Sequence, residues 1–221
     1  MAEEEATTSY HSPPPKIHGG VSKVASRRSP VRVFIIALLA LVILAGVVAL
    51  VLYLVYRPSR PRFSVTTAAI YSITNTSSSP AAAAVSATMQ FTLLIRNPNS
   101  RSSVRYDRLS AHVAYRGEAI TPPVPLPPLV LESGMAVSVS PVLGGAAVPV
   151  SANVAAGLAT DKAYGVVALR LVVVGRGKYK SGPFHSRWNS MYVRCDMLVG
   201  VRKGVTGQVP LLGNPDCHVD I

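Results

Sequence analysis

Acidic residues, cysteine and tryptophan are scarce in this chain. Its 221 residues include 10 Asp and Glu against 22 Lys and Arg, with only 2 Cys and 1 Trp. The net charge of +12 does not form one basic surface, because residues 63–221 hold fourteen basic and seven acidic side chains. Basic and aromatic residues form no clustered stripe of the kind that binds nucleic acid, so we expect no nucleic-acid partner. We interpret the moderate positive charge as a solvated basic face, and attraction to anionic lipid or acidic polysaccharide is the alternative.

Motifs for catalysis and metal binding are also missing. The chain has no Gly-x-Ser-x-Gly nucleophile elbow. Cys217-His218 lacks metal-ligand spacing, since a zinc site needs three or four convergent ligands. Gly175-x-Gly177-Lys178 lacks the rest of a phosphate-binding loop and is predicted to be a turn between strands. The residues of a nucleophilic set are scattered: Cys195, His185 and Asp196. We therefore predict no catalytic site, no cofactor and no metal.

One long apolar run stands out against these absences. Residues 33–56 contain no charged side chain. As a helix rising about 1.5 Å per residue they would reach roughly 36 Å, which exceeds the hydrocarbon core of about 30 Å. A cleaved signal peptide fits badly, because 32 residues precede the run and no Ala-x-Ala site follows it. We predict a transmembrane signal anchor over residues 33–56.

The flanks of this run predict its orientation, because the more basic flank usually faces the cytoplasm. Five basic residues precede it and three follow it: Lys16, Lys23, Arg27, Arg28 and Arg32, against Arg57, Arg60 and Arg62. This modest bias favours a single-pass type II protein with a cytosolic N terminus and an extracellular C-terminal domain. A C-terminal glycolipid anchor is not expected, because the last residues are polar.

Residues 1–32 are predicted to be a disordered cytosolic tail, since they are rich in Pro, Ser and Gly and offer little to bury. Ser12 and Ser29 each precede proline and are candidate phosphorylation sites. A phosphate at Ser29 would oppose the charges of Arg27 and Arg28.

Period-two alternation of apolar and polar residues dominates the rest of the chain. Residues 85–93, 109–116, 135–139 and 191–197 alternate, and residues 166–174 form a nearly continuous apolar run. Clusters of Pro, Gly and Asn separate them, which favours a mainly β, antiparallel sandwich. Ser151 is expected to cap one short helix ending near Thr160. The proline-dense residues 121–128 are predicted to form a connection or a sheet edge. Residues 57–84 would hold a juxtamembrane linker and the first strand, and residues 85–221 the remainder of the domain.

Several short motifs add local predictions. Asn97-Pro98-Asn99 is predicted to be a structural turn, because proline fixes φ and asparagine tolerates turn conformations. Asp107, after Tyr106, is expected to cap a turn or to pair with its neighbours Arg105 or Arg108.

The two cysteines lie beyond the anchor. Cys195 and Cys217 are predicted to form a disulfide in an exported compartment. A buried free thiol is the alternative, since Cys195 is in phase with neighbouring apolar residues. Asn75-Thr76-Ser77 is the sole N-glycosylation sequon, on the expected outer side.

The order of these motifs resembles a plant family. Asn97-Pro98-Asn99, the segment beginning Tyr106-Asp107 and Val193-Arg194-Cys195-Asp196 follow a basic tail and a single anchor. In this they are similar to the NHL proteins, the non-race-specific disease resistance and harpin-induced-like group, whose exposed domain is of late-embryogenesis-abundant group 2. The resemblance implies an immunoglobulin- or fibronectin-III-like sandwich. The chain departs from the family pattern at Leu129 and at residues 175–180.

The resemblance also implies function and location. It points to the plasma membrane, with the endoplasmic reticulum as the alternative, and to plant defence or stress signalling through protein partners. The other hypothesis is a lipid ligand held in the apolar interior or in a groove between the sheets, so that the domain stabilises membranes under dehydration or cold. In both hypotheses the bilayer is itself a partner.

Overall fold

The structure is a computed structural model that describes residues 30–56, 59–77, 83–201, 206–213 and 215–221. Contacts divide the chain into two units, Met1–Val51 and Leu52–Ile221. Helix α1 (Pro30–Tyr56), most of which lies in the first unit, covers the whole predicted anchor and begins three residues before it. Its first residue is a proline, which suits the first turn of a helix. The helix is long and apolar enough to cross a membrane. The candidate phosphorylation sites Ser12 and Ser29 lie outside the described residues.

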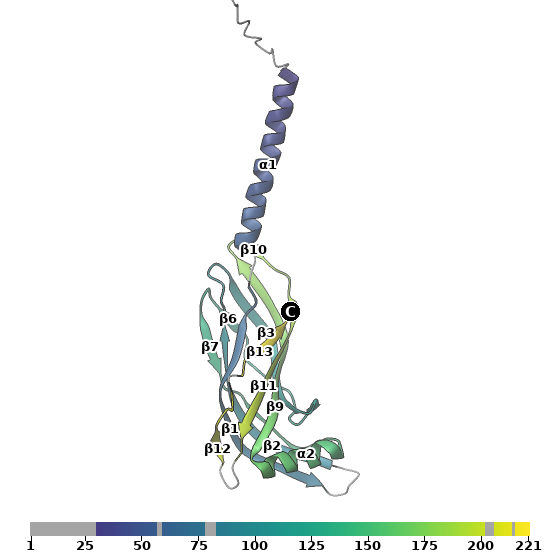
Figure 1. Cartoon of the computed structure of the whole chain (residues 1–221). Helices are drawn as coiled ribbons and strands as arrows, with labels where there is room; N and C mark the ends of the chain where they lie inside the picture. The colour runs from purple at the N-terminus through teal and green to yellow at the C-terminus, as the bar shows by residue number, and fades with distance from the viewer. Residues whose placement is uncertain (1–29, 57–58, 78–82, 202–205, 214) are drawn as a thin grey trace, which may run out of the picture. The chain divides into compact units, whose positions relative to one another are not determined.

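The second unit consists of two antiparallel sheets, which confirms the prediction of a mainly β sandwich (Figure 1). The first sheet contains β12 (Gly207–Val209), β1 (Arg62–Ser77), β2 (Ala83–Arg96), β7 (Ala136–Val139) and β8 (Val142–Pro149). The second contains β13 (Cys217–Asp220), β11 (Asn189–Gly200), β9 (Val166–Ser181), β10 (Phe184–His185), β3 (Ser103–Tyr115), β4 (Glu118–Ala119), β5 (Val124–Pro125) and β6 (Leu129–Leu131). The predicted boundary at residue 84 falls just inside β2.

Alternation builds the core between these sheets. In β2 every second residue faces inward and is buried: Val85, Ala87, Met89, Phe91, Leu93 and Ile95. From the second sheet the core receives side chains such as Leu109, Val113, Leu171 and Val193. Each large side chain buried in this way contributes about 1.5–3 kcal/mol relative to its exposed state. The described core side chains therefore occupy the space between the two sheets.

Helix α2 (Ala152–Tyr164) confirms the predicted short helix and extends four residues beyond Thr160. The Ser151 hydroxyl accepts a hydrogen bond from the Val154 amide at 3.3 Å, which satisfies one of the free donors of the first turn. Gly165 ends the helix at φ 87°, and its amide donates to the carbonyls of Asp161 and Lys162.

The predicted turn at residues 175–178 is wrong, because these residues lie inside the continuous strand β9. Gly175 lies beside an irregularity in β3, where the pairing shifts between Asp107 and Ser110. A Cβ on Gly175 would come within 2.6 Å of Leu109 Cδ2 and 3.1 Å of Leu109 Cα. The glycine thus permits close packing of two strands instead of a reversal of the chain. The proline-dense segment does form a sheet edge, where β5 pairs with β3.

Candidate functional site

The Asn97-Pro98-Asn99 motif builds a buried hydrogen-bond network where the chain joins the sandwich. The Asn97 side chain is 0% exposed. Its Nδ2 donates to the carbonyls of Ser102 at 2.7 Å and Glu132 at 3.0 Å, and its Oδ1 accepts from the Asn99 amide at 3.1 Å and from Asn99 Nδ2 at 2.9 Å. The Ser59 amide donates to Asn99 Oδ1 at 2.6 Å, and Asn99 Nδ2 donates to the Ser59 carbonyl at 2.9 Å. We call this set, Ser59, Asn97, Asn99 and Ser102, the tether network.

The motif is therefore more than a reversal of the chain. Asn97 satisfies buried backbone groups of two loops, and Asn99 ties the first described residue after α1 to the loop between β2 and β3. Buried polar groups are costly unless they are hydrogen-bonded, so this network fixes the conformation of the loops it joins.

Tyr106 and Asp107 lie beside each other on β3 but in different environments. Tyr106 is fully buried and packs edge-on against Phe63, with ring centroids 6.1 Å apart. Burial raises the pKa of its hydroxyl, which has no hydrogen-bond partner among the described residues. Asp107 accepts hydrogen bonds from Arg176 Nε at 3.0 Å and Nη2 at 2.5 Å. The hydrogen bond from Arg176 lowers the pKa of Asp107. Asp107 thus forms its ion pair with Arg176 of β9 and not with its sequence neighbours Arg105 or Arg108.

Cys195 and Cys217 are joined by a disulfide. They stand opposite each other in the pairing of β11 with β13, with Cα atoms 4.2 Å apart. Cys195 lies in the core and Cys217 is half-buried. The bond fastens the last strand, which pairs along only four residues, to the centre of the second sheet.

The other candidate reactive residues are not brought together. Cys195 is held in the disulfide, and Asp196 pairs with Arg170 Nε at 2.5 Å. His185 and Cys195 pair with positions of β9 that are nine residues apart, a separation of about 30 Å along the strand. Within the described part of the chain no group of three or more His, Cys, Asp or Glu side chains is arranged to hold a metal ion.

The glycosylation candidate Asn75 lies exposed on β1. Its Nδ2 donates to the Ala155 carbonyl of α2 at 2.7 Å. A glycosylated Asn75 would keep one N–H on this nitrogen, so the hydrogen bond to Ala155 is compatible with a glycan. Glycosylation at Asn75 stays a prediction.

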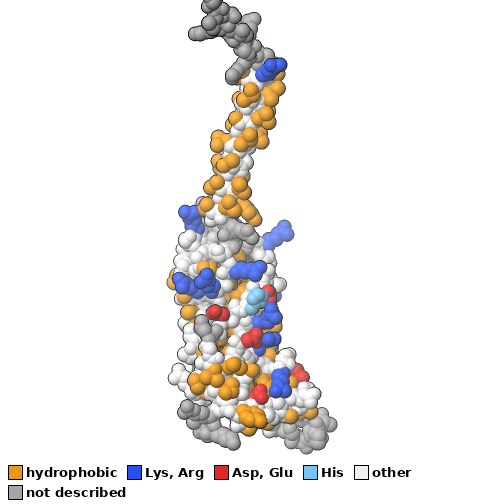
Figure 2. All heavy atoms as spheres, viewed as in Figure 1, with side chains coloured by type: hydrophobic (Ala, Val, Ile, Leu, Met, Phe, Trp, Pro, Cys, Tyr) orange, Lys and Arg blue, Asp and Glu red, His pale blue; other side chains and the backbone are white. Residues whose placement is uncertain are grey.

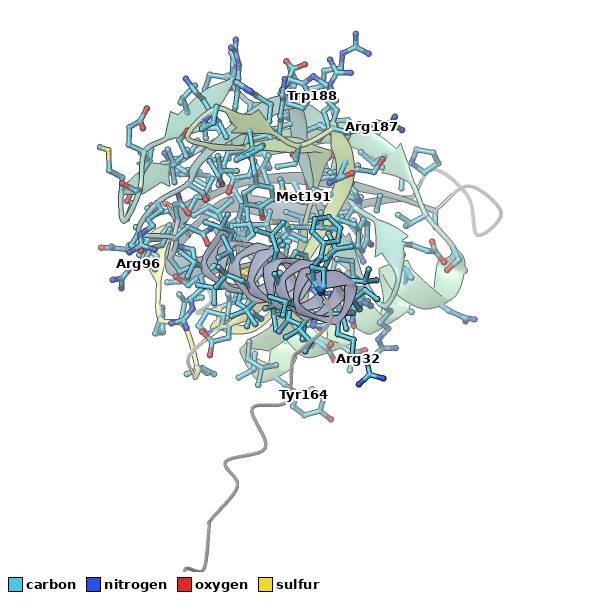
Figure 3. All side chains as sticks on the ribbon, turned by 90° about the horizontal axis from the view of Figure 1, so that it is seen from above. Arg32, Arg96, Tyr164, Arg187, Trp188 and Met191 are labelled. Carbon is cyan, nitrogen blue, oxygen red and sulfur yellow. A yellow bond between two sulfur atoms is a disulfide. The ribbon has the colours of Figure 1, made fainter. Side chains whose placement is uncertain are left out.

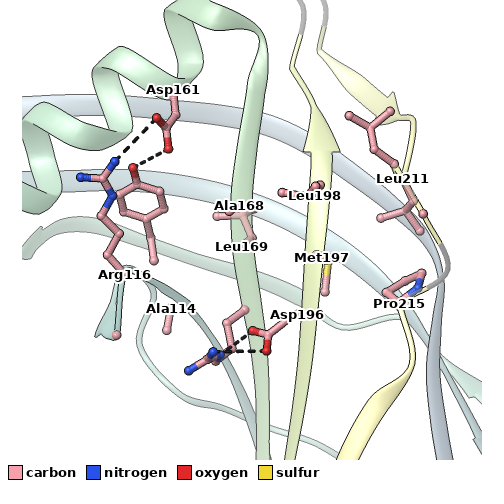
Figure 4. A pocket seen from close by; sticks show the side chains of 15 residues that line it. Ala114, Arg116, Asp161, Ala168, Leu169, Asp196, Met197, Leu198, Leu211 and Pro215 are labelled. Atoms are coloured by element: carbon pink, nitrogen blue, oxygen red, sulfur yellow. Dashed lines mark hydrogen bonds and ion pairs between the residues drawn. The ribbon is translucent and has the colours of Figure 1, made fainter.

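An open cleft lies beside α2, with a volume of about 850 Å³ (Figure 4). We call it the α2 cleft. It is lined by residues 114–117, Asp161, residues 168–170, residues 196–198, residues 211–213 and Pro215. Strands β3, β9 and β11 supply one part of the lining, and the segment after β12 supplies the other. Sequence patterns did not reveal it, because its parts are far apart in the chain.

Two ion pairs lie in the lining of this cleft. Arg116 Nη2 lies 3.7 Å from Asp161 Oδ1, and the Tyr115 hydroxyl donates to Asp161 Oδ2 at 2.6 Å. Burial, together with this hydrogen bond, raises the pKa of Tyr115 to about 12. Tyr115 therefore remains a neutral donor that holds the Asp161 carboxylate on the cleft wall. Elsewhere on the cleft wall, Arg170 donates two hydrogen bonds to the Asp196 carboxylate.

Large apolar side chains are exposed in and near the same cleft. Leu198 and Leu212 are each 46% exposed and line it. Tyr164, the last residue of α2, is 84% exposed, and Val166 begins the adjoining strand. Figure 2 shows hydrophobic side chains gathered low on the face in view. Contiguous exposed apolar surface of this kind is typical of interaction sites.

Comparison with known proteins now places the chain in a family. It is 30% identical to NDR1/HIN1-like protein 1 of Arabidopsis thaliana, over 83% of this chain and 87% of the relative. The chain belongs to the NDR1/HIN1-like family. It is also 29% identical to NDR1/HIN1-like protein 26 over 70% of this chain and 71% of that protein, and 25% identical to protein 12 over 77% and 79%. Both are from Arabidopsis thaliana.

The late embryogenesis abundant protein family model matches residues 92–195. This NDR1/HIN1-like domain thus carries within the match the motif at residues 97–99, the Asp107–Arg176 pair, helix α2 and the first cysteine of the disulfide. The match also contains most of the lining of the α2 cleft. The resemblance drawn from the motifs is confirmed.

Proposed function

We propose that this chain is a type II plasma-membrane protein of plant defence or stress signalling. Helix α1 anchors it with the N terminus in the cytosol, and the sandwich is displayed outside the cell as a non-catalytic module that binds a protein partner. The single observation that carries this proposal is the α2 cleft, with its satisfied ion pairs and exposed leucines. Membership of the NDR1/HIN1-like family supports the biological setting.

The chemistry of the cleft suits a protein partner. Stable protein interfaces surround a few buried apolar or aromatic anchors with a polar rim. Leu198, Leu212 and the nearby Tyr164 supply exposed apolar area, while Asp161 and Asp196 are already paired within the domain. Because each carboxylate is already paired with an arginine, a partner that covers it does not bury an unpaired charge. The desolvation cost of an unpaired buried charge is therefore avoided.

The position of the cleft also favours an external partner. Its lining on β9 and β11, residues 168–170 and 196–198, lies near the strand ends where Val166 pairs with Gly200. The chain joins the domain at the other end, where Arg62 pairs with Arg96. Ten to twelve residues of β9 separate Lys180, near the joining end, from residues 168–170 of the cleft, a distance of roughly 33–40 Å in a strand. The wall of the cleft formed by β9 and β11 is therefore remote from the tether, whereas Pro215 of the other wall accepts a hydrogen bond from the Val65 amide, three residues after Arg62.

Two observations support display on the outer side. The Cys195–Cys217 disulfide is typical of exported compartments. The five-to-three bias of basic residues around α1 favours a cytosolic N terminus.

The experiment is proximity labelling in plant protoplasts with the full chain carrying a labelling enzyme at its C terminus. The test variant is the double substitution Leu198→Asp and Leu212→Asp, compared at equal surface abundance. The matched control is Val142→Asp on β8, where the valine is 53% exposed and lies outside the cleft. We expect the test variant to lose a defined set of labelled proteins that the control retains. An identical set in all three proteins would contradict the cleft as the binding site, and unchanged pathogen and stress responses in plants lacking the chain would contradict the wider role.

A membrane-stabilising role in abiotic stress is the second candidate. Because core side chains occupy the space between the sheets, this role rests on an outer surface of the domain. The surface that favours it is the basic one around the tether network.

A further inference from the structure

Basic side chains surround the end of the sandwich at which the chain arrives from α1. We call them the basic collar: Arg60, Arg62, Arg96, Arg101, Arg105, Lys178, Lys180 and Arg187. The strand register brings them to one end, since Arg62 pairs with Arg96 and Arg105 pairs with Lys178. All are exposed except Lys178, which is half-buried. Seen from above, Arg96 and Arg187 lie on different sides of the domain, so the collar is not confined to one face (Figure 3).

The collar is not neutralised within the domain. The ion pairs found among the described residues involve Arg116, Arg170, Arg176, Arg194 and His218, and none involves a collar residue. Two acidic residues share its clefts: Glu132 lies with Arg101, Arg105, Lys178 and Lys180, and Asp216 lies with Arg60 and Arg62. Two histidines, His185 and His218, line the same clefts. Eight cations against two carboxylates leave a strong positive charge at this end.

The tether network holds this charge close to the bilayer. Ser59 lies three residues after Tyr56, the last residue of α1. Covalent geometry alone limits three residues to about 10 Å. Asn99 binds Ser59 through two hydrogen bonds, and Arg60 and Arg101 lie one and two residues from these anchoring positions. With α1 in the membrane, the collar starts within about 10 Å of the end of α1, a distance comparable with the Debye length of roughly 8 Å at physiological salt.

We propose that the basic collar binds the phosphate groups of anionic lipids in the leaflet from which the domain emerges. Two facts favour anionic lipid as the ligand. Its charge is opposite to that of the collar, and the short connection to α1 keeps the collar close to the bilayer surface. Arginine guanidinium groups suit phosphate, because their planar donors bind its oxygens in pairs. Lipid contact at this end leaves the α2 cleft free at the other. The inference does not depend on the protein partner proposed above.

The single tryptophan provides a probe within the collar region. Trp188 follows Arg187, is 39% exposed, and packs on Arg176, whose guanidinium carbon lies 4.9 Å from the ring centroid. The full chain is placed in nanodiscs of phosphatidylcholine alone or with 30% phosphatidylserine. A fraction of the lipid carries a spin label on the headgroup, which quenches nearby tryptophan fluorescence. We expect stronger quenching of Trp188 in anionic discs, and its return to the neutral-disc level in 0.5 M salt.

Two variants with equal charge change separate the collar from net charge. The test variant is Arg101→Ala, Arg105→Ala and Lys180→Ala. The control is Ala159→Glu, Ala163→Glu and Gln208→Glu, which also lowers the charge by three at exposed positions away from the collar.

Each basic residue near an anionic surface favours association about fivefold. The test variant should therefore lower the equilibrium constant for collar contact about a hundredfold, while the control keeps the anionic-disc signal. Exchanging the same three residues between Arg and Lys preserves charge and should preserve quenching.

Three results would contradict lipid binding by the collar. Equal quenching in neutral and anionic discs would overturn the proposal, as would equal loss in the test and control variants. A response of Trp188 to polygalacturonate in neutral discs, without a response to anionic lipid, would assign the collar to acidic polysaccharide and also overturn it. The salt dependence of Trp188 quenching is measured on the unsubstituted chain. It therefore tests the proposal even if a variant fails to fold.

Discussion

Asn97 is expected to be the most sensitive polar residue of the domain. The side chain is 0% exposed and makes four hydrogen bonds of 2.7–3.1 Å to loop groups, three of which are buried. Asn97→Ala removes these bonds and leaves buried carbonyls and an amide without their partner. A hydrogen bond contributes about 1 kcal/mol net, and an unsatisfied buried group costs about 1–3 kcal/mol. Partial hydration of the Glu132 carbonyl relieves some of this cost, so we expect a loss of about 4 kcal/mol in the free energy of unfolding.

Urea unfolding of the full chain in nanodiscs measures this loss, with the disulfide intact and Trp188 fluorescence as the signal. A domain of this size has an m value of about 2 kcal/mol per molar urea. The midpoint should therefore fall by about 2 M for Asn97→Ala. Asn153→Ala, an exposed asparagine of α2, is the control and should change the midpoint by no more than about 0.3 M.

A variant of similar size separates hydrogen bonding from packing. Asn97→Leu fills the space but cannot donate to the Ser102 and Glu132 carbonyls. We expect it to be at least as unstable as Asn97→Ala. Wild-type stability in the leucine variant, or a shift below about 0.5 M in the alanine variant, would refute the reasoning that the network stabilises the domain.

Three further predictions concern the sheets. Gly175→Ala should lower stability by about 1–3 kcal/mol through overpacking, whereas Gly177→Ala, whose Cβ would meet its nearest atom at 3.8 Å, should stay within about 0.5 kcal/mol in the same urea assay. Reducing the disulfide, or Cys195→Ala, should cost about 3 kcal/mol; equal midpoints with and without reductant would contradict this. Asp107 has a pKa below its ordinary 3.8 because of Arg176, so its stabilisation is present above that value and is lost as pH falls below it. Thermal melting of Asp107→Asn should therefore show a shallower loss of stability below about pH 4 than the wild type, and parallel curves would contradict the assignment.

Local patterns predicted the elements whose signal is itself local. The alternation over residues 85–93 identified β2 because one face of that strand is fully buried. Ser151 identified the start of α2 because capping involves residues only three apart. Strand β8 escaped notice, since its Gly-Gly-Ala-Ala centre has no alternation and much of it is exposed.

Features that depend on distant residues could not be predicted from the sequence. Asp107 and Arg176 are 69 positions apart, so nearer arginines offered the more obvious partners. Gly175 looked like a turn residue, because nothing in its own neighbourhood reveals that Leu109 packs against it. The α2 cleft and the basic collar likewise arise from the register of several strands.

The outward display of the sandwich is the claim on which the proposed function depends most directly. Protease treatment of intact plant protoplasts, with a tag at the C terminus and a cytosolic marker as control, tests it. We expect the tag to be digested while the cytosolic marker survives. A tag that is protected in cells where the chain has reached the plasma membrane would place the sandwich in the cytosol and contradict the account.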